Sequence, residues 1–176
     1  MSDRLTPETI AGLRDSVAKD QEAALLLDSA ARFVDRGWTQ TYDAVNRHGV
    51  SVPPHSPQAV CWCMRGALLR GCVAIGIVEL IDNGRPFFDA VDVDRERTTS
   101  IRGRAFRAAA VAALGHEPSQ LASLPGIITN WNDTTAMSGE TVARRLRAAA
   151  ATVRRRIGEV ERGIAEAERR LPGGTS

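Results

Sequence analysis

Side chains that could support acyl transfer follow one another along the chain in the order Gln40, Cys63, His116, Asn132 and Asp133. Nucleophilic catalysis by a thiol needs a base to take its proton and an amide or carboxylate to orient that base. A further amide can donate a hydrogen bond to the developing oxyanion. The sequence thus predicts Cys63 as the nucleophile, His116 as the base and Asp133 as the carboxylate that orients the base.

Three tryptophans stand beside short polar residues and predict a second kind of site. Indoles form rigid apolar walls, and a few polar groups between them would orient a small molecule. The alternative is structural, with each tryptophan pinning a loop onto the core while its polar neighbours close turns or cap backbone groups. The residues predicted to bind the ligand are Trp38, Gln40, Cys61, Trp62, Trp131 and Asn132.

The segment from Ser56 to Cys72 predicts a central helix. A serine at its start can accept a hydrogen bond from a first-turn N–H, and Pro57 suits the first helical position. Apolar residues occupy both sides of this segment, and a helix that is apolar all round is buried. Two residues turn a helix by about 200°, so Cys61 and Cys63 point to opposite sides.

Two interpretations of these cysteines stay open. Each is a buried free thiol that acts as a small hydrophobe, or one of them has a thiol acidified by the N-terminus of the helix. A zinc site built from His48, His55, Cys61 and Cys63 matches no common ligand spacing. No metal and no other cofactor is therefore predicted.

Shorter signals predict the other elements before the central helix. Thr6-Pro7 begins a first helix, Asp20 caps a second one, and Gly37 follows the end of that second helix. Alternating residues at 41–45 and 50–52 predict a short β-hairpin around a turn at 46–49.

After the central helix the pattern is less decisive. Residues 73–81 favour a continuation of the helix as far as Asn83-Gly84, and the alternative is a strand that turns back there into residues 87–91. A helix is predicted over 101–114 with Gly115 as its stop, and residues 130–133 are expected to form a polar loop around an indole.

The last predicted helix runs from Gly139 to Arg170 behind a Ser138 cap and carries a coiled-coil-like apolar seam with a single stutter. Such a helix is roughly 48 Å long, so its far end either protrudes or packs against another chain. This predicts a homodimer. Its arginines are followed by glutamates and lack an aromatic platform, so nucleic-acid binding is not predicted. The seam residues are Val142, Leu146, Ala149, Val153, Ile157, Val160, Ile164, Ala167 and Leu171.

Composition favours one mostly α domain, because alanine is abundant and aromatic residues make up only 5% of 176 residues. We expect a compact fold of about five helices around the buried central helix, with a short β-hairpin and a long C-terminal helix. Residues 1–150 would form the core and 151–176 a helical extension with a disordered tail. Three cysteines, no leader and no long apolar span predict a soluble cytoplasmic protein that contacts no membrane.

Three segments taken together, Trp38-Thr39-Gln40, Cys61-Trp62-Cys63 and Trp131-Asn132-Asp133, resemble DUF6197, a family of small actinobacterial and phage proteins with no established activity. The resemblance covers roughly residues 25–150. It implies a first helix, the Trp-Thr-Gln segment, a cysteine-bearing helix, a Trp-Asn-Asp loop and a C-terminal helix. The chain departs from the family pattern at Thr41, where glycine is usual, and at Arg65, where a small or apolar residue is usual.

Two functions from different classes follow from these patterns. The first is a Trp-lined, cysteine-adjacent small-molecule site, used by a cysteine-dependent acyl-transfer or hydrolytic enzyme. The second is a non-catalytic interaction or regulatory protein that self-associates, or binds a partner, through its long C-terminal helix.

Overall fold

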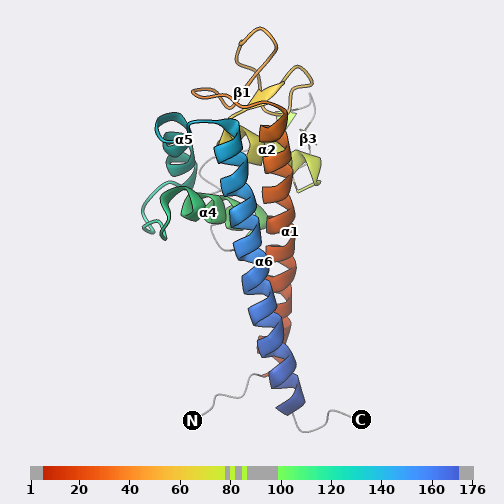
Figure 1. The fold of residues 1–176 in the computed structure, drawn as a ribbon. Helices are drawn as coiled ribbons and strands as arrows, with labels where there is room; N and C mark the ends of the chain where they lie inside the picture. Colours follow the sequence, from red (N-terminus) through yellow and green to blue (C-terminus); the bar gives the residue numbers. More distant parts are fainter. Residues whose placement is uncertain (1–5, 78–79, 82–84, 87–98, 171–176) are drawn as a thin grey trace.

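The fold is taken from a computed structural model that describes residues 6–77, 80–81, 85–86 and 99–170 (Figure 1). The predicted fold class is confirmed, because helices dominate these residues and a long helix closes the chain. Within these ranges the helices are α1 (Pro7–Arg36), α2 (Met64–Ala74), α4 (Ile101–Leu114), α5 (Leu124–Thr134) and α6 (Gly139–Arg170). The strands are β1 (Ala44–Val45), β2 (Cys61–Trp62), β3 (Leu80–Ile81) and β4 (Arg85–Pro86).

Helices α1 and α6 lie side by side as a long antiparallel pair, and the shorter elements gather around its upper half in Figure 1. The predicted seam of α6 is buried in this contact even far from the other elements, where Ile164 is 6% exposed and Ile10 of α1 is equally covered. An ion pair between Arg14 and Glu168, 2.6 Å apart, joins the far ends. The sequence predicts protrusion or contact with a second chain for this half of α6. In the structure it packs on α1 of its own chain, and the pair extends beyond the shorter elements (Figure 1).

The first helix is continuous, so the predicted break at Asp20 is wrong. It begins where expected, with the Thr6 hydroxyl accepting a hydrogen bond from the Thr9 N–H. Asp20 lies in the middle of α1 and is buried, with its carboxylate 2.7 Å from the guanidinium of Arg104. A carboxylate can be buried inside a helix when it is paired in this way, and the sequence could not show that partner.

The central helix is shorter than predicted, because α2 begins at Met64 and not after Ser56. Cys61 and Trp62 form strand β2, which pairs antiparallel with β1, and the Trp62 N–H donates to the carbonyl of Gly37. A short apolar run fits a buried strand as well as a buried helix. The burial prediction itself is confirmed, because Met64, Leu68 and Cys72 have no exposed surface.

The predicted β-hairpin forms in part. The Asn46 N–H donates to the Val50 carbonyl, and the Val52 N–H donates to the Ala44 carbonyl. The partner of β1 in the sheet is nevertheless β2, from a segment assigned to the helix. The hairpin therefore contributes one edge to a sheet that a later part of the chain completes.

Beyond α2 the favoured helix is also wrong, because α2 ends at Ala74 and strands β3 and β4 pair antiparallel on either side of residues 82–84. This agrees with the alternative of a strand that turns back. Its return segment at 87–91, and the tail at 171–176, lie outside the described residues.

Helix α4 has the predicted bounds, and Gly115 ends it in the left-handed conformation with φ of 80°. The predicted polar loop at residues 130–133 is wrong, because these residues belong to α5. The Ser123 hydroxyl accepts a hydrogen bond from the Gly126 N–H, and Pro125 lies in the first turn, where it does no harm. Pro125 and Gly126 therefore lie in the first turn of this helix and do not interrupt it.

Thr41 is strained, because it is the one non-glycine residue with positive φ (71°) in the described part of the chain. A β-branched side chain is disfavoured there, whereas glycine adopts this conformation readily. We expect Thr41→Gly to raise the free energy of unfolding by about 1 kcal/mol, once the greater chain entropy of glycine is subtracted. Urea denaturation measures this change, and a loss of stability in T41G would show that contacts of the threonine side chain outweigh the backbone strain.

Candidate functional site

Four of the residues predicted to form a site come together: Trp38, Gln40, Asn132 and Asp133, here called the Asn132 cluster. The first two follow the end of α1, and the other two lie on the last turns of α5. The amide nitrogen of Gln40 donates to the carbonyl of Asn132 (3.2 Å), in the last turn of α5, and to that of Ala136 (3.2 Å), just after the helix. The cluster thus closes the C-terminal end of α5, where carbonyls otherwise lack partners.

Asn132 is the centre of the cluster and has no exposed surface. Its Oδ1 accepts hydrogen bonds from Trp38 Nε1 and from the Met64 N–H, both at 3.0 Å. Its Nδ2 donates to the Thr39 carbonyl at 3.2 Å and to Asp133 Oδ1 at 2.9 Å. Both donors and both acceptor positions of the amide are used, so this group has no capacity left for a ligand.

Cys63 adjoins the cluster as the N-cap of α2. Its sulfur accepts a hydrogen bond from the Gly66 N–H at 3.3 Å, and its thiol donates to Asp43 Oδ1 at 3.5 Å. Arg65 holds the same carboxylate through two contacts, at 2.9 and 2.5 Å. Burial, reinforced by the negative charge of Asp43, raises the pKa of Cys63 to about 12. These surroundings favour the thiol over the nucleophilic thiolate.

The remaining predicted residues are spread around this region. Cys61 is half-buried in β2, and Trp62 packs against Phe33 with ring centroids 5.2 Å apart. Trp131 is buried in the core. His116 is exposed after α4, where its Nδ1 lies 3.0 Å from the carbonyl of Glu117.

A different place offers room for a ligand: a cavity of about 400 Å³ between α1, α4 and α6, here called the α1/α4/α6 groove. None of the residues that line it was predicted as a site residue. On α4 and α6 the lining residues recur every three or four positions, so each helix contributes one continuous stripe. The lining residues are Ser16, Asp20, Arg104, Arg107, Ala108, Val111, Ala112, Gly115, Glu117, Arg145, Ala148, Ala149, Thr152, Val153 and Arg156.

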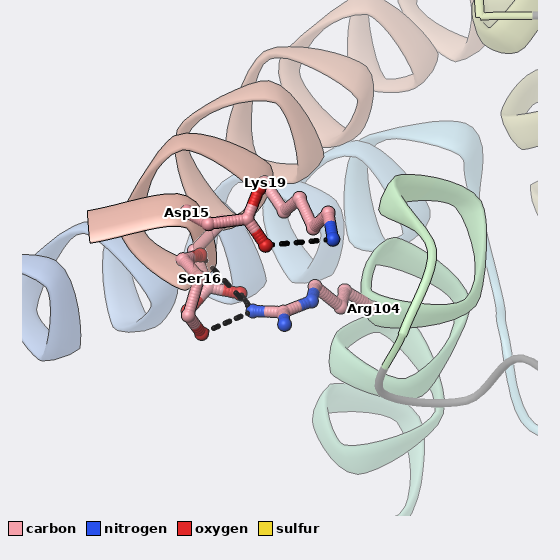
Figure 2. Close-up of polar contacts among 5 residues, drawn as sticks. Asp15, Ser16, Lys19 and Arg104 are labelled. Carbon is pink, nitrogen blue, oxygen red and sulfur yellow. Dashed lines mark hydrogen bonds and ion pairs between the residues drawn. The ribbon is translucent and has the colours of Figure 1, made fainter. Parts of the chain in front are cut away.

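Arg104 is fixed in the wall of the groove by contacts to α1 (Figure 2). Its Nη1 donates to the carbonyl and the hydroxyl of Ser16, at 3.1 and 2.9 Å, and to Asp20 Oδ1 at 2.7 Å. The side chains of Arg104 and Asp20 are only 17% and 13% exposed. The Nε of Arg104 is buried without a hydrogen-bond partner. The wall of the groove therefore contains an arginine that is fixed in position by its contacts to α1.

Four other charged side chains line the groove: Arg107, Glu117, Arg145 and Arg156. Arg107 pairs with Glu117 at 3.0 Å, so both carboxylates of the lining are already matched by arginines. Arg145 and Arg156 are exposed on α6, and neither forms a hydrogen bond or ion pair with another described residue. The groove thus has two positive charges that no lining residue balances.

This groove was not predicted from the sequence, although its residues follow a recognisable pattern of arginines and small residues on shared helix faces. Arg104, Ala108 and Ala112 lie on one face of a predicted helix, and Arg145, Ala149 and Arg156 lie on one face of another. The sequence predicts no binding role for the arginines of the last helix. Only the packing of α4 against α6 shows that the two faces meet.

The described residues include neither a metal-binding cluster nor a membrane-spanning helix. No group of three or more histidine, cysteine or acidic side chains there could hold a metal ion. Among the helices that the structure describes, none is long and apolar enough to cross a lipid bilayer.

Comparison with known proteins gives one match. The model of a family of unknown function, DUF6197, matches residues 18–152. Neither the curated proteins nor the solved structures include a match to this chain.

We expect Asn132→Ala to lower the free energy of unfolding by about 2–4 kcal/mol, because it leaves the buried donors of Trp38 and Met64 without an acceptor. The matched control is Asn130→Ala, at an exposed position of the same helix, which should change stability by less than about 1 kcal/mol. Urea denaturation compares the two. Equal losses of stability in the two variants would show that the hydrogen bonds of the buried Asn132 amide add nothing to the free energy of unfolding beyond the effect of an exposed asparagine.

Cys63 should react with iodoacetamide in the folded protein at least about tenfold more slowly than a model thiol near pH 8, because its raised pKa and its burial remove thiolate. Its rate should keep increasing at pH values well above 9.0, the ordinary cysteine pKa, where the rate of the model thiol levels off because that thiol is almost fully ionised. Half-buried Cys61 is the internal control, and fragment mass spectrometry separates the two sites. Fast, selective alkylation of Cys63 would restore it as a candidate nucleophile.

Proposed function

The chain belongs to DUF6197, a family of unknown function, and we propose that it is a small-molecule-binding protein whose ligand lies in the α1/α4/α6 groove. The groove itself is the observation that carries this proposal. Its volume of about 400 Å³ falls in the range of roughly 300–1,000 Å³ that is typical of ligand sites.

The lining of the groove supports binding for two reasons. It combines apolar residues, alanines and valines from α4 and α6, with charged side chains. Arg104 is held by three contacts to α1, so it loses little freedom when a ligand arrives. Ala148 and Thr152 are exposed on α6, which leaves the groove open for a ligand to enter.

A cysteine-dependent reaction at Cys63 has less support. Its thiol is buried, caps α2 and donates to Asp43. Asp133, the predicted orienting carboxylate, accepts hydrogen bonds from the Thr41 N–H and from Asn132 through one oxygen. These contacts match the structural alternative, in which a tryptophan and its polar neighbours pin a connection onto the core.

Self-association through α6 also has less support than ligand binding. The apolar seam that motivated it faces α1, with Ile157 and Ile164 buried in that contact. Arg154 of α6 pairs with Asp28 and Arg147 pairs with Asp35, which adds to the attachment between the two helices. A dimer would need another surface of α6.

The proposal predicts that filling the groove abolishes ligand-dependent stabilisation. Ala148 is exposed and lines the groove, so Ala148→Trp should block it without disturbing the core. The matched control is Ala151→Trp, on an exposed part of α6 outside the groove. In a thermal-shift screen of a metabolite library, a compound at about 100 times its Kd should stabilise the wild type by roughly 2.7 kcal/mol. The same shift should appear in A151W and disappear in A148W; hits that stabilise all three proteins equally would refute the proposal.

A further inference from the structure

The charges of the α1/α4/α6 groove specify the kind of molecule it accepts. Of its four arginines, Arg104 and Arg107 are neutralised by the two carboxylates of the lining. Arg145 and Arg156 have no such partner among the described residues. An anion entering here would find unmatched positive charge in a concave site, where it is screened less by water than on an open surface.

The lining between Arg145 and Arg156, here called the floor, determines the polarity of the rest of the ligand. It is formed mainly by alanine and valine side chains, which offer no hydrogen bonds, and Thr152 adds a single hydroxyl. The apolar residues come from α4 (Ala108, Val111 and Ala112) and from α6 (Ala148, Ala149 and Val153). A sugar or peptide backbone placed there would leave most of its polar groups without partners, which costs free energy. An apolar body loses nothing by this contact and gains from leaving water.

The spacing of the two unmatched arginines limits the position of the anionic group. Arg145 and Arg156 are eleven residues apart on α6, which is about 16 Å along the helix axis. A single carboxylate or phosphate therefore contacts one of them, while the body of the ligand extends along the floor toward the other. An elongated molecule fits this arrangement better than a compact one.

We infer that the groove binds an amphipathic organic anion, with a carboxylate or phosphate at one of the unmatched arginines and an extended apolar body on the alanine and valine floor. This inference rests on the proposed function, because it names the ligand class of the same groove. The anionic group receives charge-assisted hydrogen bonds from Arg145 or Arg156. Arg104, held by Ser16 and paired with Asp20, gives the wall a fixed shape and adds no net charge to it.

Isothermal titration calorimetry with four probes of equal chain length tests the inference: decanoate, decyl phosphate, decanol and decylammonium. We expect both anions to bind at least about tenfold more tightly than decanol, a factor typical of one charge-assisted contact. Decylammonium should bind most weakly. Added salt should weaken the binding of the anions and leave that of decanol nearly unchanged. Comparing decanoate with decyl phosphate distinguishes a carboxylate from a phosphate as the preferred group.

Variants locate the binding. The double variant Arg145→Gln/Arg156→Gln should raise the Kd of the better anion about tenfold or more, and Ala148→Trp should abolish its binding. The matched control is Arg144→Gln, which removes one exposed charge outside the groove and should leave Kd unchanged. Circular dichroism confirms that each variant is folded.

The possible failures separate the two proposals. Equal affinity for decanol and the anions, lost in A148W, would overturn the inference of an anion and leave the groove as a ligand site. Anion binding that survives both A148W and the double arginine variant would place the site elsewhere and overturn the inference. Absence of binding by all four probes would overturn it too, while the library screen with A148W decides the proposed function independently.

Discussion

The arrangement of α2, α5 and the connection that follows α1 depends on the hydrogen bonds of the buried Asn132 amide. One side chain accepts from an indole after α1 and from the first N–H of α2, and it donates to a backbone carbonyl and to Asp133. Because an unpaired polar group at this depth is costly, none of these segments can shift without breaking several hydrogen bonds together. The amide therefore fixes α5 and α2 against the connection that leaves α1.

This constraint explains why the polar residues that first suggest chemistry serve the fold. Gln40 donates to the carbonyls that end α5, and Cys63 caps α2 with its sulfur. A side chain committed to such contacts, as the Cys63 thiol is to Asp43, is not free to act on a substrate. Residue types typical of catalytic sites are equally suited to closing helix ends, because both tasks use the same donors and acceptors.

The α1/α4/α6 groove has the opposite character. Its helices meet through small side chains, which leave space between them, and two of its four arginines have no ion-pair partner among the described residues. Strong contacts nevertheless support it, because Arg104 is anchored to α1 by Ser16 and Asp20. A rigid wall combined with unsatisfied charge is what a binding site needs, and here the two occur away from the cysteines and tryptophans.

The sequence by itself determined the features that act within a helical turn. The Thr6 cap, the left-handed Gly115 and the extent of α6 all follow from neighbouring residues, and helical periodicity sufficed for the fold class. Tertiary structure decided what depends on distant partners. Residues 61–62 became a strand because Gly37 and β1 supply their hydrogen bonds, and Asn132 acquired its role through partners 94 and 68 residues away. The groove likewise exists only because α1, α4 and α6 meet, since periodicity shows which residues share a face but not which faces come into contact.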